Sequence, residues 1–150
     1  MSDSTTTVAE LRAAVDEFVA AREWHQFHNP KDLAVSIAIE AAELLEEFQW
    51  LDAPQVAAVA GDPAARERAS LELADILIYC LSLGNALGLD LSETIRAKLV
   101  LSGRKYPAEA YRGRAHKPGQ SLRTDAEPAP PASSAAGNLV SGSALAEGES

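Results

Sequence analysis

Residues 33–50 read LAVSIAIEAAELLEEFQW, and residues 71–82 read LELADILIYCLS. Apolar residues recur in both stretches at intervals of three and four, which is the period of an α-helix. Each stretch also contains two acids three residues apart, so each pair lies on one face of its helix. If the two helices pack antiparallel through these faces, all four carboxylates converge. The acids are Glu40 and Glu43 in the first stretch and Glu72 and Asp75 in the second.

Four convergent carboxylates repel one another and raise each other's pKa values, so a cation is expected between them. All four candidate ligands supply oxygen atoms, which favours Mg²⁺, or Mn²⁺ in its place, over zinc or copper. Neither pair has a histidine in the fourth position, where the di-iron carboxylate bundles carry one. The pattern therefore predicts a magnesium site formed by two helices.

A surface position is the alternative for these acids, because pairs of acids at this spacing are common on solvated helix faces. That interpretation stays open for Glu46 and Glu47, which continue the first stretch. Glu40 differs, since its neighbours are mostly apolar and residues 33–50 contain no lysine or arginine to pair with it. The setting of Glu40 favours metal binding over a solvated face.

The rest of the chain has the same helical period, and an aromatic content of only 5% favours packed helices over a β-sandwich. We predict an all-α fold with four main helices, whose ends are marked by capping residues, prolines and a glycine stop. The predicted helices cover residues 8–24, 33–50, 63–86 and 90–103, with a short turn at 55–60. The end signals are Thr7 with Glu10, Asn29-Pro30, Asp62-Pro63, Gly88, and Asp90 with Glu93.

Composition divides the chain of 150 residues into one domain and a tail. Residues 1–112 hold the periodic apolar positions, whereas residues 113–150 are rich in Pro, Ala, Ser and Gly and have no apolar face. Such a segment cannot bury enough surface to offset its ordering entropy. We therefore predict a disordered C-terminal tail.

The net charge of −9 argues against binding to a nucleic acid polymer, whose phosphates require a basic surface. Cys80 is the only cysteine, which excludes a disulfide within the chain, and its apolar neighbours predict a buried thiol. The first residues do not resemble a signal peptide, and we expect no stretch with the roughly 18 apolar residues of a membrane span. These observations predict a cytoplasmic protein that does not bind membranes.

Aromatic and imidazole groups follow the first predicted helix, where residues 22–28 read REWHQFH. The indole of Trp24 can stack on a nucleobase, and His28 can hydrogen-bond to a base edge or a phosphate. The alternative is that Trp24 and Phe27 close the end of the core. Trp50 allows the same two interpretations.

The only basic cluster near the end of the helical region contains Lys98, Arg104 and Lys105, beside Tyr106. If the last helix packs beside the metal site, Lys98 can neutralise phosphate charge that the metal leaves uncovered. The alternative for Arg104 and Lys105 is that they are solvated and stabilise the helix end through its dipole.

Together these motifs resemble the all-α nucleoside triphosphate pyrophosphohydrolases, or MazG-like superfamily, whose signature is E-x-x-E followed after a spacer by E-x-x-D. The four acids described above fit that signature. The dCTP pyrophosphatase branch is the closer match, over residues 22–107. The matching segments are REWHQFH at 22–28, EEFQW at 46–50, ELADILIY at 72–79 and RKYP at 104–107.

The resemblance implies a four-helix bundle that assembles as a homodimer or homotetramer. It implies a Mg²⁺-dependent enzyme that hydrolyses a nucleoside triphosphate between the α and β phosphates, releasing the monophosphate and pyrophosphate. The implied catalytic and metal-binding residues are Glu40, Glu43, Glu72 and Asp75. The implied substrate-binding residues are Trp24, His28, Trp50 and Tyr79 for the base and sugar, and Lys98 and Tyr106 for the phosphates.

The substrate implied by the resemblance is dCTP or a modified dCTP, which the enzyme would remove from the nucleotide pool. A pyrophosphohydrolase of different or broad base preference is one alternative, since two tryptophans can stack on any base. A non-catalytic helical module that binds metal or a partner is the other. Val100 and Ser102 depart from the residues that family members often carry, and Gly103 is expected to shorten the last helix, so we expect a weaker phosphate contact.

Overall fold

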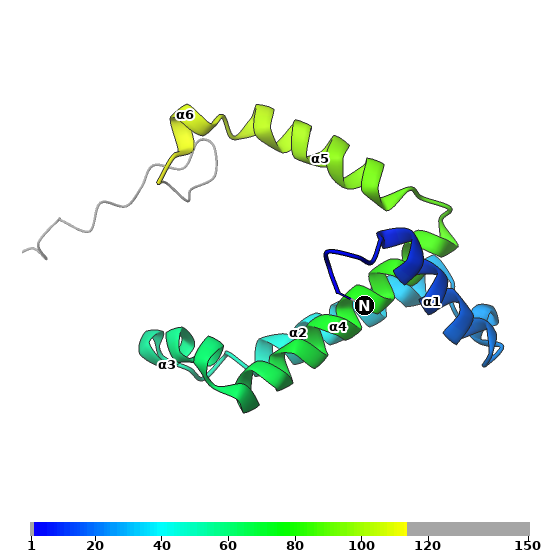
Figure 1. Ribbon diagram of the computed structural model, residues 1–150, viewed down its shortest axis with the longest axis horizontal. Coiled ribbons are helices and arrows are strands. Elements are labelled where there is room, and N and C mark those ends of the chain that lie inside the picture. Colours follow the sequence, from blue (N-terminus) through cyan, green and yellow to red (C-terminus); the bar gives the residue numbers. More distant parts are fainter. Residues whose placement is uncertain (1, 114–150) are drawn as a thin grey trace, which may run out of the picture. The chain divides into compact units, whose positions relative to one another are not determined.

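A computed structural model describes residues 2–113 of the chain, and within this range it contains helices and turns but no strand (Figure 1). The prediction of an all-α fold is therefore confirmed. Residues up to Ala110 form one compact unit. The predicted disordered tail lies outside the described residues, apart from Gly113. The elements are α1 (Val8–Ala20), η1 (Trp24–Gln26), α2 (Pro30–Glu46), α3 (Ala53–Ala58), η2 (Val59–Gly61), α4 (Pro63–Ala86), α5 (Leu91–Lys105) and α6 (Ala108–Tyr111).

Hydrogen bonds between residues close in sequence start these helices where the sequence predicted. At the start of α1 the Thr7 hydroxyl accepts the Glu10 N–H, and the Glu10 carboxylate accepts the Thr7 N–H in return. The side chain of Asp62 accepts two N–H groups at the start of α4, and that of Asp90 accepts one at the start of α5. Each cap satisfies donors that the first turn of a helix leaves without partners.

The predicted glycine stop ends α4. Gly88 has a φ of +62°, a left-handed conformation that glycine adopts without steric cost. The Gly88 N–H donates to the Asn85 carbonyl at 3.1 Å, and the Leu89 N–H donates to the Gly84 carbonyl at 2.9 Å. These two bonds are those of a Schellman motif, which closes the helix and directs the chain into α5.

The end of α1 differs from the prediction. The helix ends at Ala20 rather than near Trp24. Glu23 has a left-handed φ of 55°, which no α-helix accommodates, and Trp24 starts the short 3₁₀ turn η1. The predicted Trp24 and His28 ligands therefore lie on a connection between helices.

Both ends of α2 also differ from the prediction. The helix begins at Pro30 because the Asn29 side chain accepts the Asp32 N–H, so Asn29 caps the helix. It ends at Glu46, and the following turn residues up to Trp50 are not helical. Trp50 therefore does not extend the helical face of the acids.

The last predicted helix is longer than expected. Gly103 does not shorten it, since α5 continues to Lys105 and the Tyr106 N–H donates to the Ser102 carbonyl at 2.8 Å. Glycine costs a helix stability but retains the N–H and C=O groups that continue it.

α2 packs against α4 in an antiparallel orientation, and α1 also contacts α4 (Figure 1). Glu47, directly after α2, pairs with Arg68 near the start of α4, with 2.8 Å between Oε2 and Nε. At the other end, Pro30 at the start of α2 lines the same cavity as Ser82 and Asn85 near the end of α4. The predicted orientation is thus confirmed, and it brings the two acidic pairs to the same level.

Arg12 joins α1 to the end of α4. Its Nε donates to the Asn85 Oδ1 at 2.8 Å, and one of its terminal nitrogens donates to the Leu89 carbonyl at 2.6 Å. The amide of Asn85 returns a 3.1 Å bond to the Arg12 carbonyl. This set of bonds connects residues more than seventy positions apart and holds α1 beside the carbonyls that end α4.

Replacing Arg12 with alanine is expected to lower the free energy of unfolding by about 2 kcal/mol, because hydrogen bonds from a charged donor are lost and Asn85 keeps an unpaired oxygen. Urea unfolding of the full chain followed by circular dichroism measures the change. Arg66→Ala is the matched control, since Arg66 is an exposed arginine on α4. Equal midpoints for the two variants would show that the Arg12 bonds contribute nothing.

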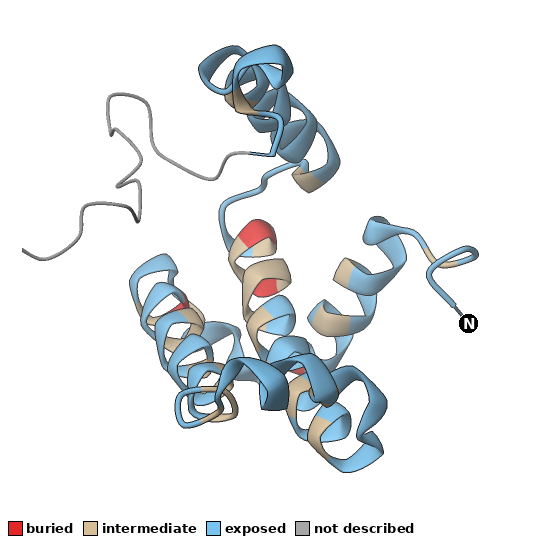
Figure 2. Cartoon of the chain, turned by 90° about the vertical axis from the view of Figure 1, so that its left-hand side faces the viewer, coloured by how far each residue is buried: buried red, intermediate tan, exposed pale blue. Residues whose placement is uncertain are grey.

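Few of the residues that the structure describes are buried in the single chain (Figure 2). Among the described residues, the only large apolar side chains classed as buried are Val19 and Leu33. Cys80 is half-buried, so the prediction of a fully buried thiol is wrong for the single chain. Large apolar residues are exposed on several helices, among them Val35, Ile39 and Leu45 of α2, Leu73 and Leu77 of α4, and Ile95 and Leu99 of α5.

α4 is the one described helix that is long and apolar enough to cross a membrane, judged by length and composition alone. It has 24 residues and reaches a mean hydropathy of 1.2 over 18 of them. This measure differs from the predicted one, because α4 contains no unbroken run of 18 apolar residues. The core helix of a soluble protein passes the same test, and α4 carries Glu72 and Asp75 near its middle.

Candidate metal and nucleotide site

Three of the four predicted metal ligands form a compact group. Carboxylate oxygens of Glu40, Glu43 and Glu72 lie within 4.8 Å of one another, so one small ion can contact all three. Glu40 and Glu72 are half-buried, and Glu43 is exposed. The antiparallel packing of α2 on α4 creates this group, because it sets the acids of the two helices at the same height. Asp75 is exposed and lies outside the three-carboxylate group.

The charges of neighbouring acids raise the pKa values of two members of this group. Partial burial raises the pKa of Glu40, and the charges of Glu43, Asp75 and Glu72 raise it further. Burial also raises the pKa of Glu72, with added repulsion from Glu43, Asp75 and the acids at the end of α2. Asp75 therefore belongs to the same electrostatic site although it is outside the compact group. Negative charge gathered in this way favours a bound cation.

The donor set fits a hard divalent cation. Mg²⁺ and Mn²⁺ prefer oxygen ligands, and every group here is a carboxylate, with no cysteine or histidine in the cluster. Such an ion would be held by Glu40, Glu43 and Glu72, with Asp75 beside them. It would supply the positive charge that offsets both their mutual repulsion and the charge of a phosphate ligand.

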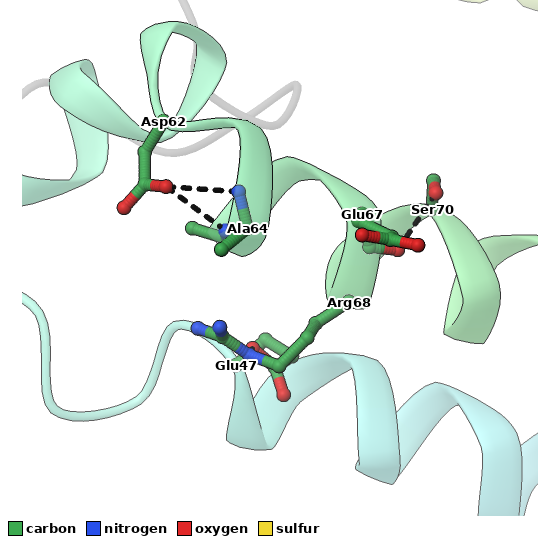
Figure 3. A network of polar contacts seen from close by, with 7 residues as sticks. Glu47, Asp62, Ala64, Glu67, Arg68 and Ser70 are labelled. Atoms are coloured by element: carbon green, nitrogen blue, oxygen red, sulfur yellow. Dashed lines mark hydrogen bonds and ion pairs between the residues drawn. The ribbon is translucent and has the colours of Figure 1, made fainter.

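Glu47 takes a different role from the acids that precede it on α2. Arg68 of α4 reaches toward Glu47 (Figure 3). The distance between Arg68 Nε and Glu47 Oε2 is 2.8 Å. The partner comes from the other helix, which explains why residues 33–50 contain none. Glu47 is thus an ion-pair residue, and Glu46 is exposed, as the surface interpretation of these two acids proposed.

The raised pKa values predict how Mg²⁺ binding depends on pH. The metal requires ionised carboxylates, and Glu40 and Glu72 take up protons above the ordinary glutamate value of 4.5. In the metal-free protein a raised carboxyl pKa contributes stability below 4.5 that is lost as pH rises through the folded value. We therefore expect the increase in melting temperature caused by Mg²⁺ to be largest near pH 7 and to shrink before pH falls to 4.5.

Thermal unfolding at a series of pH values, with and without Mg²⁺, measures this effect. Ca²⁺ at the same ionic strength shows whether the increase depends on the ion, and K⁺ controls for screening. An increase that stayed constant between pH 4.5 and pH 7 would contradict the assignment of Glu40 and Glu72 as ligands.

A cavity of about 400 Å³ lies beyond the acids, where α1, the η1 connection, the start of α2 and the end of α4 meet. Its volume is in the range of small-molecule sites. His28 lines it, and the predicted contact of this imidazole with a ligand stays a prediction. The other lining residues are Val15, Asp16, Val19, His25, Pro30, Ser82, Asn85 and Ala86.

The predicted aromatic ligands are distributed over both ends of α2. Trp24 packs edge-on against Phe18 with ring centroids 6.0 Å apart, beside the cavity's His25. Trp24 and Phe27 are both exposed, so in the single chain they do not close the core. Trp50 is 85% exposed and lies beyond the opposite end of the helix. One chain therefore does not bring Trp24 and Trp50 together.

Tyr79 stands between the acids and the cavity. It is half-buried on α4, four residues after Asp75 and three before Ser82, so all three share one helix face. A ligand that reaches from the acids to the cavity passes Tyr79. The predicted contact of Tyr79 with the base or sugar stays a prediction.

The predicted phosphate ligands lie on α5 and directly after it. Lys98 is exposed, and Tyr106 follows the last turn, with Lys105 Nζ 5.3 Å from the Tyr106 ring centroid. Neither Lys98 nor Tyr106 belongs to the carboxylate group or lines the cavity. Their predicted role in phosphate binding therefore stays a prediction.

Sequence reasoning missed three polar groups at the cavity. The His25 ring pairs with Asp16 at 2.9 Å, and the Ser82 hydroxyl is buried. Asp16 and His25 come from separate elements, so no local spacing connects them. Ser82 had a detectable signal, since it continues the face of Asp75 and Tyr79 as a polar residue in an apolar run.

Comparisons with known proteins agree with this arrangement. The model of the MazG-like family matches residues 35–120. The dCTP pyrophosphatase 1 of Bos taurus is 39% identical over 116 residues, which cover 76% of this chain and 68% of that protein. The dATP/dGTP diphosphohydrolase of Cyanophage S-2L is 34% identical over 109 residues, covering 71% and 84%. The crystal structure of a pyrophosphatase from Archaeoglobus fulgidus superposes with a TM-score of 0.62 at 35% identity, covering 71% of this chain and 98% of that one.

Proposed function

Because the chain belongs to the MazG-like family and is a nucleoside triphosphate pyrophosphatase, we propose that it hydrolyses dCTP or a modified dCTP in a Mg²⁺-dependent reaction. The products are the monophosphate and pyrophosphate. The observation that carries the proposal is the group of Glu40, Glu43 and Glu72 within 4.8 Å. A cavity with both apolar and polar lining residues, large enough for a base, is reached along the same face of α4.

The position of each residue in the site suggests its role in the reaction. Glu40, Glu43, Glu72 and Asp75 would hold Mg²⁺, which would supply Lewis acidity and positive charge at the phosphates. A carboxylate that the ion leaves free orients the attacking water and accepts its proton. The cavity beside His28 holds the base, so the α phosphorus is placed at the level of the acids. Lys98 of α5 neutralises charge on the outer phosphates, and Tyr106, directly after α5, donates a hydrogen bond to them.

The choice of dCTP is supported by the bovine relative, whose name specifies dCTP. The cyanophage relative is named for dATP and dGTP, which makes a different or broad base preference the alternative within the same reaction. The chain spans about two thirds of the bovine protein, so its preference requires direct measurement.

We further propose that the working enzyme is a homodimer or homotetramer. Trp50 and His28 lie beyond opposite ends of α2, whose 17 residues span about 25 Å. A second copy can place its Trp50 beside the cavity of the first, which one chain cannot do. The exposed apolar residues of α2, α4 and α5 would be covered in the same assembly. A cytoplasmic location, where dNTPs are made and used, fits this function.

The deciding assay incubates the purified full chain with each dNTP and NTP in the presence of Mg²⁺ and separates the products. We expect monophosphate and pyrophosphate, with dCTP the best substrate and no turnover in EDTA. Water labelled with ¹⁸O identifies the attacked phosphorus, because attack at α places the label in the monophosphate. Orthophosphate as the first product would rule out cleavage between α and β, and turnover of no nucleotide would favour a non-catalytic module.

A further inference from the structure

Ser82 is buried at the cavity without a hydrogen-bond partner. The residue is 6% exposed, and within the described part of the chain its Oγ atom has neither solvent contact nor a partner. A buried hydroxyl is nearly always satisfied, since burial without a bond is unfavourable. Ser70, on the same helix, shows the ordinary arrangement, because it is exposed and its hydroxyl donates to the Glu67 carbonyl at 2.7 Å (Figure 3). The unpaired state of Ser82 requires a reason.

The helix face that carries Ser82 also carries the acids of the metal site. Glu72, Asp75, Tyr79 and Ser82 follow one another at intervals of three and four residues. At the rise of an α-helix, Ser82 lies about 10 Å from Asp75 and about 15 Å from Glu72 along the axis. An extended nucleoside triphosphate covers a comparable length. Phosphates at the acids therefore place the base at the level of Ser82.

The walls of the cavity suit the faces of a base. Val15, Val19, Pro30 and Ala86 are apolar, and the buried hydroxyl of Ser82 beside them lacks a partner. Asp16, His25 and His28 also line the cavity. The polar side chain of Asn85 is already engaged by Arg12. A serine hydroxyl can occupy three staggered positions about χ1, so a ligand can draw Oγ toward the cavity without moving the helix.

We propose that Ser82 is a specificity-determining residue, whose hydroxyl forms a hydrogen bond with the polar edge of the nucleobase. This proposal rests on the proposed function, since it assigns the base to the cavity and the phosphates to the acids. A site that keeps a polar group unpaired until the correct base binds discriminates against bases that cannot pair with it.

The test compares wild type with Ser82→Ala on dCTP, dTTP, dATP and dGTP. We expect kcat/KM for the preferred nucleotide to fall about tenfold, through a higher KM at an unchanged kcat, because one neutral hydrogen bond made in both ground and transition states is lost. The fall in kcat/KM for the other three nucleotides should be smaller. The ratio of kcat/KM between the preferred nucleotide and the others therefore decreases. The melting temperature should rise, because an unpaired buried hydroxyl is removed.

Ser70→Ala is the matched control and should leave kcat/KM unchanged for all four nucleotides. If Ser82→Ala lowered kcat/KM by the same factor for all four nucleotides, or left all four values as in wild type, the ratios between nucleotides would be unchanged. Either result would overturn the proposal. Calorimetry with non-hydrolysable α,β-imido dNTPs measures the dissociation constant of each nucleotide. The ratios of these constants report base preference without turnover. An enzyme that hydrolyses nothing would thus defeat the proposed function, whereas unchanged binding ratios would defeat only the role of Ser82.

Discussion

Replacing Glu72 with glutamine is expected to lower Mg²⁺-dependent hydrolysis at least about 100-fold, because a metal ion contributes several kcal/mol of transition-state stabilisation and Glu72 is one of the acids that hold it. The same substitution should raise the melting temperature of the metal-free protein at pH 7. Burial and the charges of neighbouring acids raise the pKa of Glu72, so its ionised form is unfavourable in the fold without a cation. Glutamine keeps the shape of the side chain and removes the charge.

Two measurements check this result. Initial rates at saturating Mg²⁺ report hydrolysis, and thermal unfolding with and without Mg²⁺ reports stability and binding. Glu67→Gln is the control, since Glu67 is an exposed acid on the same helix outside the carboxylate group. A Glu72→Gln enzyme with wild-type activity, or one whose melting temperature still rises with Mg²⁺ as wild type does, would contradict the metal site.

Replacing Leu77 with glutamate is expected to separate the subunits and to reduce activity about tenfold or more at micromolar protein. Leu77 is 54% exposed in the single chain, and it lies two positions from both Asp75 and Tyr79, so it lies on the opposite face of α4 from the acids. A charge there cannot touch the site of its own chain. If a second copy covers this face, a buried unpaired glutamate makes that contact unfavourable.

Light scattering after size exclusion gives the mass of each variant, and unfolding at several protein concentrations gives a second readout. The melting temperature of an assembled protein rises with concentration, whereas that of a monomer does not. Ser92→Glu is the control, since Ser92 is an exposed polar residue. A wild-type chain that elutes as a monomer, or a Leu77→Glu chain that stays assembled, would remove the proposed interface.

Local sequence patterns were sufficient to predict where α1, α4 and α5 begin and where α4 ends. Thr7, Asp62, Asp90 and Gly88 act through hydrogen bonds that reach no more than a few residues along the chain, and such bonds can be read from local patterns. The left-handed Glu23 has no comparable signal, since glycine or asparagine is the usual residue in that conformation. The prediction that Trp24 is helical failed there.

In the candidate site, too, local spacing predicted some features and helix packing decided the others. The acids could be placed on one face of each helix from their spacing alone, because helical geometry is regular over a few turns. Whether they met depended on the packing of α2 against α4, which groups Glu40, Glu43 and Glu72 and assigns Glu47 to Arg68 instead. The bounds of α2 likewise place Trp50 and His28 beyond opposite ends of the helix.

By itself, then, the sequence determined the helical fold, the acidic pairs and the family to which they belong, because these depend on periodicity and on contacts between near neighbours. Only the tertiary structure decided which acids share a site, that Ser82 is buried without a partner, and that apolar faces of α2 and α4 are left uncovered. Those properties depend on contacts between residues far apart in the chain, and their free energies come from packing and burial, which no local pattern records.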